Sequence, residues 1–303
     1  MSDIKLFSLS GEVNELPSSS VTLERELQIN IEKNMEKFFG IKFLKSEYTI
    51  TNGRIDSLGL DENFCPVIFE YKRSINENVI NQGLFYLDWL LDHKADFKLL
   101  VMETLGDETA NKIDWSLPCV ICIASDFTRY DEHAVNQMQR NIKLVKYKKF
   151  GEDLILFEHL NAPKVKPDLA EITAHPKVSN NKKRSEKTFL QQFECATPEW
   201  QNLYLTIKDY ILSLGDDVTE NQLKLYVAFK KARNIACVEL YASQKYILIH
   251  LALDPKTVEL RKDFTRDMTN IGHYGTGNLR VRIKSLKDFY EAKTLIERAY
   301  NEG

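Results

Sequence analysis

The hydrophobic pattern of residues 1–162 changes between helical and strand-like spacing. Apolar residues from Leu23 to Phe39 recur at helical intervals, which predicts a first helix with its N-cap near Thr22 and its end at Gly40. Residues 1–20 predict a short strand and then a polar loop. Further strands are expected at residues 41–50, 53–60, 66–72, 97–102, 118–124, 143–147 and 154–158, and helices at 77–93, at 107–113 and from Ser125/Asp126 to Arg140.

Hydrophobic density falls between residues 163 and 188, where prolines, polar residues and a Lys182-Lys183-Arg184 run predict an exposed basic linker. The pattern resumes at residue 189. It predicts helices at 198–214 and 286–300 and strands at 224–229, 236–241, 246–251 and 279–283. The expected organisation is therefore an α/β domain at 1–162, a linker at 163–188 and a smaller α+β domain at 189–303.

Composition agrees with two globular domains. The chain has 303 residues, of which 43% are hydrophobic and 28% charged. Its apolar runs are shorter than a membrane-spanning helix requires, and its start does not resemble a secretory signal. The five cysteines are odd in number and scattered in apolar surroundings, which predicts reduced thiols in a cytoplasmic protein.

Charge is distributed unevenly along the chain. Residues 1–162 hold 18 Lys+Arg and 26 Asp+Glu, whereas residues 163–190 hold 7 and 3. No region is basic enough to indicate nucleic-acid binding by charge alone. If the acidic first domain handles a polyanion, it needs metal ions or a local basic face.

Three charged residues occur inside otherwise apolar predicted strands. Asp56 lies in one strand, and Glu70 and Lys72 project from one face of the next, because side chains alternate along a strand. The intervening turn can bring Asp56 beside Glu70 at a sheet edge or fork. Two carboxylates and an ammonium there can hold a hard divalent cation and leave positions for water and a phosphate. An ordinary ion-pair cluster on a solvent-facing strand is the alternative interpretation of these residues.

The order of a glutamate-bearing helix, a Gly-Arg-Ile-Asp strand, a turn, a Glu-Tyr-Lys strand and a helix with Gln82 and Tyr86 resembles the PD-(D/E)XK, or restriction-endonuclease-like, nuclease superfamily. The resemblance is strongest to its prokaryotic repair and defence endonucleases and covers about residues 20–160. It implies a mixed central sheet flanked by helices.

The resemblance also implies roles for individual residues. Asp56 and Glu70 would be metal ligands and Lys72 the catalytic lysine, while Gln82 resembles a helix glutamine near the metal or the scissile phosphate. Glu24 is the expected first-helix glutamate, with Glu26 and Glu32 as rivals.

Basic side chains provide candidate nucleic-acid contacts. Lys146 and Lys148 flank Tyr147 in the first domain, and Arg280, Arg282 and Lys284 alternate along a predicted strand of the second. Solubility is the competing explanation for both groups.

The sequence as a whole predicts a Mg²⁺-dependent DNA endonuclease, with Mn²⁺ as a possible substitute, that acts in DNA repair or in defence against foreign DNA. DNA is the expected partner, a homodimer is possible, and no membrane association is expected. The alternative is a non-catalytic DNA- or protein-binding module that keeps a nuclease fold.

Overall fold

The computed structural model describes residues 4–19, 24–72, 79–151, 153–161 and 187–302. The predicted start of the first helix at Thr22 lies outside these ranges, as does all of the predicted linker except its last two residues. The described residues divide into two compact units. The first comprises those within 1–61, 66–113 and 118–163, and the second those within 62–65, 114–117 and 164–303.

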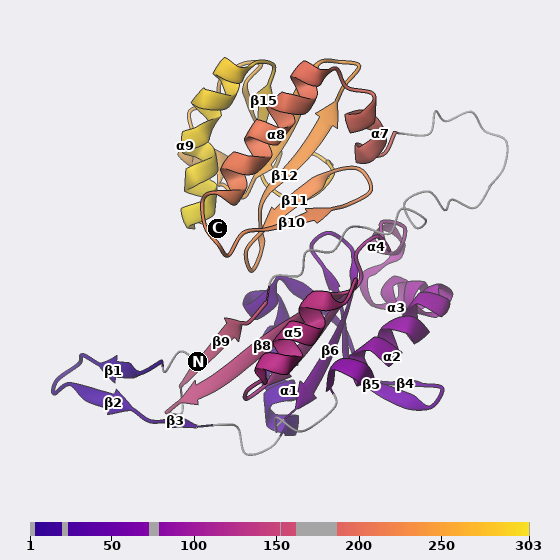
Figure 1. The fold of residues 1–303 in the computed structure, drawn as a ribbon, viewed down its shortest axis with the longest axis vertical. Coiled ribbons are helices and arrows are strands. Elements are labelled where there is room, and N and C mark those ends of the chain that lie inside the picture. Colours follow the sequence, from indigo (N-terminus) through magenta and orange to yellow (C-terminus); the bar gives the residue numbers. More distant parts are fainter. Residues whose placement is uncertain (1–3, 20–23, 73–78, 152, 162–186, 303) are drawn as a thin grey trace. The chain divides into compact units, whose positions relative to one another are not determined.

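A mixed sheet forms the centre of the first unit, in the order β3-β8-β7-β6-β5-β4, with β9 also paired to β8 (Figure 1). Strands β4, β5 and β6 are antiparallel neighbours, whereas β6, β7 and β8 run parallel. The strands are β3 (Ser18–Ser19), β4 (Ile41–Ile50), β5 (Gly53–Asp61), β6 (Pro66–Lys72), β7 (Cys119–Ala124), β8 (Asn141–Phe150) and β9 (Leu154–His159).

Five helices accompany this sheet: α1 (Glu24–Phe39), α2 (Val79–Asp92), α3 (Lys94–Leu105), α4 (Asp107–Ala110) and α5 (Arg129–Gln137), counted over the described ranges. The apolar side of α1 packs on the sheet face that carries Phe69 and Tyr71 of β6 and Ile121 of β7. The structure confirms the α/β class and the mixed central sheet flanked by helices.

Helix α2 covers the opposite face of the sheet. Its Gly83 lies so close to β7 that a Cβ atom there would be 2.6 Å from Val120 Cγ1. Val120 and Cys122 alternate with Ile121, so α1 and α2 enclose β7 between them. The same alternation along β6 places Glu70 on the α2 face.

Three sequence-based predictions for the first unit were wrong. Residues 97–102 form part of α3 instead of a strand, because only Phe97 and Val101, four residues apart, are buried. Helix α5 is capped by Thr128, whose side chain and that of Asp131 form a capping box, and it ends at Gln137. The short N-terminal strand is present as β1 (Leu6–Ser8), but the polar loop expected after it contains β2 (Asn14–Leu16), which forms a hairpin with β1, and then β3.

The second unit contains a sheet of order β10-β11-β12-β13-β15-β14, and each neighbouring pair is antiparallel. The expected strand at 279–283 is confirmed. The sequence missed the two short polar edge strands, β10 and β14. The strands are β10 (Thr219–Gln222), β11 (Val227–Lys230), β12 (Asn234–Tyr241), β13 (Tyr246–Leu251), β14 (Thr265–Asp267) and β15 (Leu279–Ile283).

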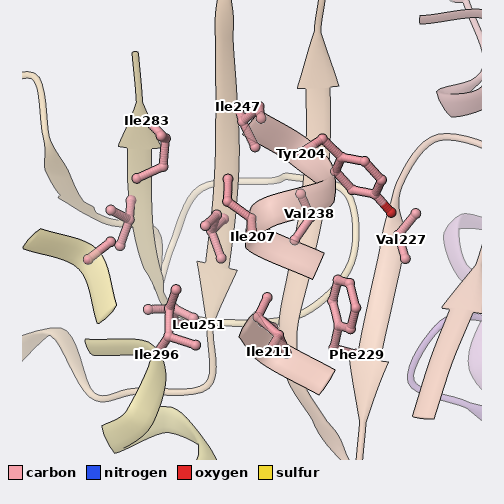
Figure 2. Packing of buried hydrophobic residues seen from close by; sticks show 14 of the residues in the cluster. Tyr204, Ile207, Ile211, Val227, Phe229, Val238, Ile247, Leu251, Ile283 and Ile296 are labelled. Atoms are coloured by element: carbon pink, nitrogen blue, oxygen red, sulfur yellow. The ribbon is translucent and has the colours of Figure 1, made fainter. Parts of the chain in front are cut away.

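Helices α8 (Pro198–Leu212) and α9 (Leu286–Glu302) lie on one face of this second sheet, and α7 (Phe189–Glu194) precedes them. Figure 2 shows Ile207 and Ile211 of α8 and Ile296 of α9 packed against strand residues that include Val238 and Ile283. Because these strand residues face the helices, the alternate side chains of β12, β13 and β15 project from the other face of the sheet.

None of the described helices is long and apolar enough to cross a membrane.

Replacement of Gly83 by Ala is expected to destabilise the protein by about 1–3 kcal/mol, because the new methyl group collides with the stiff, buried side chain of Val120. This cost outweighs the helix-propensity gain of about 1 kcal/mol. Urea denaturation would measure it, with Asn81→Ala on the exposed side of α2 as the control. A Gly83→Ala protein as stable as the control would show that α2 does not press on β7.

Candidate active site

The hydrogen-bond ladder between β5 and β6 ends at the Ser57–Phe69 pair, and beyond it the two strands form a fork. Beyond this point, carboxylate side chains accept the backbone hydrogen bonds. The backbone N–H of Asp56 donates to Glu70 Oε1 at 3.2 Å, and the backbone N–H of Tyr71 donates to Asp56 Oδ2 at 3.0 Å. The fork therefore holds the two predicted acids together, as the sequence suggested.

Glu70 is fully buried, with 0% of its surface exposed. Burial, followed by the charge of Asp56, raises the pKa of Glu70 to about 9. Its second oxygen, Glu70 Oε2, is also buried and receives no hydrogen bond from a donor in the described part of the chain. A buried ionised carboxylate without full pairing is costly, so Glu70 is protonated at neutral pH unless a cation is present.

Asp56 shares this environment. Burial raises the pKa of Asp56 above its ordinary value, despite the opposing effects of the Tyr71 N–H and the Lys72 ammonium. The carboxyl groups of Asp56 and Glu70 are close enough to hydrogen-bond each other when one of them is protonated. This oxygen-rich pair, with the unpartnered Oε2 of Glu70, fits a hard divalent cation, which would take the place of the proton that Glu70 retains.

The protein donors for such a cation are few. The described residues contain no group of three or more His, Cys, Asp or Glu side chains arranged to hold a metal. Mg²⁺ is commonly bound by one or two carboxylates, with water and substrate phosphates as its other ligands. Asp56 and Glu70 match that pattern and do not form an all-protein cage.

Lys72 stands at the end of β6, two residues beyond Glu70. Its side chain is 15% exposed, and its Nζ lies 3.7 Å from Oε1 of Glu24 in the first turn of α1. The structure thus brings Glu24 to the site through Lys72. Glu26, its first rival, is exposed.

One polar face of α1 connects the helix to β5, and the sequence reasoning missed its central residue. Gln28 is buried, and its Nε2 donates to the backbone carbonyl of Asp56 at 2.9 Å and to Glu32 Oε1 at 2.9 Å. Glu32 also accepts a hydrogen bond from Ser57 Oγ at 2.6 Å. Glu24, Gln28 and Glu32 are spaced four residues apart, a helical interval that was visible in the sequence.

Gln82 bonds through Tyr86 to the start of β5, and the described residues show no hydrogen bond between Gln82 and either acid. Its Nε2 donates to the hydroxyl oxygen of Tyr86 at 2.9 Å, and that oxygen also accepts from the backbone N–H of Arg54 at 3.4 Å. The Tyr86 ring fills the space beside Gly53, where a Cβ atom would be 2.7 Å from Tyr86 Cε1. Gln82 therefore supports the strand that carries Asp56.

The candidate nucleic-acid contacts are divided between the units. Lys146 occupies the same register row as Lys72, through Ala124 on β7, and its Nζ lies 2.7 Å from Asp126 Oδ1. Lys148 is half-buried on the same strand. Arg280 and Arg282 are half-buried on β15, and Lys284 is exposed just after it.

One relative is similar in sequence to almost the whole of this chain. An uncharacterised protein of Haemophilus influenzae is 32% identical over 311 residues, an alignment that covers 99% of this chain and 100% of the relative. This chain belongs to the same family. Residues 189–303, most of the second unit, also match a domain of unknown function, DUF5655.

Two solved structures are similar to part of the chain. One is a complex of EndoMS with double-stranded DNA, at 21% identity and a TM-score of 0.29, which covers 42% of this chain and 47% of that one. The other is a repair endonuclease from Pyrococcus abyssi, at 18% identity and a TM-score of 0.28, which covers 42% and 49%. The chain thus spans about half the length of the solved structures it matches.

The raised pKa of Glu70 makes stability depend on pH when no cation is bound. Between its ordinary pKa of 4.5 and about 9, the folded protein retains a proton that the unfolded chain loses. The free energy of unfolding is therefore expected to fall as pH rises through this range, by up to about 1.4 kcal/mol per pH unit. Urea denaturation in EDTA from about pH 6 to about pH 8 would measure this slope.

Glu70→Gln should remove most of that slope, because glutamine carries no titrating proton. Glu26→Gln, which changes an exposed carboxylate on α1, is the matched control and should retain the wild-type slope. Equal slopes in all three proteins would contradict the assignment of the proton to the Asp56–Glu70 pair.

Proposed function

We propose that this protein is a metal-dependent deoxyribonuclease that hydrolyses internal phosphodiester bonds with the site around Asp56, Glu70 and Lys72. The observation that carries the proposal is the fork between β5 and β6, where the fully buried carboxyl group of Glu70 and the half-buried one of Asp56 have too little positive charge near them for both to be ionised. A surface ion-pair cluster would not require a fully buried Glu70 with an unpartnered oxygen.

Asp56 and Glu70 would hold Mg²⁺, or Mn²⁺ in its place. The cation supplies positive charge that polarises a phosphate oxygen and activates water for attack. The hydrogen bonds from the Tyr71 and Asp56 backbone fix both carboxyl groups before any ligand arrives, so their orientation does not depend on substrate.

Lys72 would stabilise the negative charge that develops on the phosphate during cleavage, or help to deprotonate the attacking water. Its low exposure strengthens the interaction, because few water molecules compete for the ammonium. Glu24 acts as a positioning residue, since its carboxylate restrains Lys72 from the start of α1.

DNA is proposed as the substrate because the Gly-Arg-Ile-Asp and Glu-Tyr-Lys motifs resemble those of DNA endonucleases. The same proposal includes contacts of Lys146, Lys148 and Lys284 with the DNA phosphate backbone. It also includes a cytoplasmic role in repair or defence and a homodimer. Half-burial of Lys148 and the Asp126 pairing of Lys146 leave Lys284 the most accessible of the three lysines.

Asp56→Asn, Glu70→Gln and Lys72→Ala are each expected to reduce cleavage by at least ~10²-fold, because each removes a cation ligand or a charge used in the transition state. Labelled single-stranded, duplex, mismatched and branched DNA, incubated with Mg²⁺, Mn²⁺ or EDTA, would reveal cleavage. Glu26→Gln is the control. Wild-type cleavage in EDTA, or an active Asp56→Asn protein with normal circular dichroism, would refute the proposal; binding without cleavage would favour the non-catalytic module.

Three glutamates of α1 should behave differently when each is changed to Gln. Glu24→Gln should slow cleavage about tenfold, because Lys72 loses a charged partner that restrains its side chain. Glu32→Gln should instead lower stability by about 1–3 kcal/mol, because it disturbs the buried bonds from Gln28 and Ser57.

Glu26→Gln should change neither property, since the side chain is exposed. Cleavage rates across pH and melting temperatures of the three proteins decide the assignment. If Glu24→Gln alters the melting temperature alone, Glu24 is an ordinary first-turn acid and leaves the site.

A further inference from the structure

A basic recess lies at the β14–β15 edge of the second sheet and has a volume of about 310 Å³. Four cationic side chains line it, from Lys262, Arg266, Arg280 and Arg282. Asp263 is its only lining carboxylate, and Phe264 provides an aromatic wall. This composition is that of an anion site rather than of an apolar pocket.

Strand register explains why the cations meet. Leu279, Val281 and Ile283 of β15 point into the core, so Arg280 and Arg282 project from the opposite face. Arg266 of β14 lies directly opposite Arg280. Like charges in directly opposed positions destabilise an antiparallel pair, so the arrangement favours an anion between them.

The described carboxylates of the second unit neutralise this cluster only in part. Asp263 Oδ1 lies 3.7 Å from Arg282 Nη1, whereas the described residues include no ion-pair partner for Arg266 or Arg280. Glu239, a buried acid on β12, attracts Arg280 without forming an ion pair with either arginine, and it lies 2.9 Å from His250 Nε2. Burial, followed by the charges of Arg266 and Arg282, lowers the pKa of Arg280 despite the opposing effects of Tyr246 and Glu239, so the positive charge at Arg280 is only partly compensated.

One hydrogen-bond donor of the recess also lacks an acceptor in the described structure. The Nε atom of Arg282 is buried and has no hydrogen-bond acceptor in the described structure. The guanidinium of Arg282 lies over the Tyr246 ring at 5.1 Å from its centroid, which restrains its orientation. A fixed guanidinium with an unused N–H is suited to the oxygens of a phosphate group.

We propose that this recess binds the terminal phosphate of a nucleotide. A phosphate monoester carries close to two negative charges at neutral pH, which suits three arginines and a lysine better than a singly charged diester does. The volume is at the lower end of the range for small-molecule sites, so it accommodates more than a phosphate ion. Phe264, which packs against the core and lies under the Arg261 guanidinium at 4.2 Å from its ring centroid, lines the recess beside the place for the attached sugar or base.

The recess revises the role predicted for the basic strand. Arg280 and Arg282 line one open recess together with Arg266 and Lys262, whereas Lys284 lies outside the lining. The inference is independent of the proposed hydrolysis, because none of these residues belongs to the unit that contains Asp56 and Glu70. A free nucleotide and the phosphorylated end of a strand both present the required group.

Isothermal titration calorimetry of the full chain in EDTA, where the proposed hydrolysis cannot proceed, tests the inference. The probes are inorganic phosphate, deoxyadenosine 5′-monophosphate, deoxyadenosine, and one short oligonucleotide with either a 5′-phosphate or a 5′-hydroxyl. We expect saturable binding of one monophosphate per chain, weaker binding of inorganic phosphate and no binding of deoxyadenosine. Preference for the 5′-phosphorylated oligonucleotide over the free monophosphate would identify a strand end as the source.

Arg280→Gln and Arg282→Gln should each weaken monophosphate binding about tenfold or more, because each removes charged hydrogen bonds. Arg266→Gln, at an exposed position that does not contribute to the core, should have the same direction of effect. Lys287→Gln makes the same charge change at an exposed position of α9 and should leave binding within about twofold of wild type.

Absence of saturable monophosphate binding would overturn the inference, as would arginine variants that bind like Lys287→Gln while retaining the wild-type circular dichroism. Equal binding of the two oligonucleotides, lost in the arginine variants, would also overturn it, because the recess would then recognise backbone diesters. Equal affinity for inorganic phosphate and the monophosphate would exclude the nucleotide as the ligand.

Discussion

The burial of Glu70 beside Asp56 is the constraint on which the candidate site depends. Strand β6 passes between the helices that cover the two sheet faces, so a carboxyl group at position 70 loses its water on folding. The hydrogen bond from the backbone N–H of Asp56 recovers only part of that loss. Either a proton or a cation must complete the pair, and the proposed metal-dependent hydrolysis relies on the cation.

Helix α1 combines two functions in one periodic sequence. Its apolar face packs on the sheet through residues such as Ile31 and Met35, while the four-residue spacing of Glu24, Gln28 and Glu32 lines up a polar face. Gln28 and Glu32 join the helix to β5 by buried hydrogen bonds, which fixes the strand that carries Asp56. With the body of the helix held in this way, Glu24 at its first turn meets Lys72.

The second unit has its own concentration of charge. A well-packed core on one side of its sheet forces the alternate residues of β15 to the other side, where β14 adds a further arginine. The same rule of alternation that builds the core therefore gathers guanidinium groups. Electrostatic repulsion among them is tolerated at the sheet edge, where solvent or a bound anion can compensate.

The sequence by itself determined the elements whose pattern is strong, the order of the strands that carry Asp56, Glu70 and Lys72, and the proximity of the two acids. These features depend on local periodicity and on a single turn. It misread residues 97–102 as a strand, because an apolar run does not reveal which of its residues are buried. It also missed Gln28, β14 and Arg266. Only the tertiary structure decided these points and the raised pKa of Glu70. Desolvation of a carboxyl group, and like charges that face each other across two strands, arise when packing brings together segments that are distant in sequence.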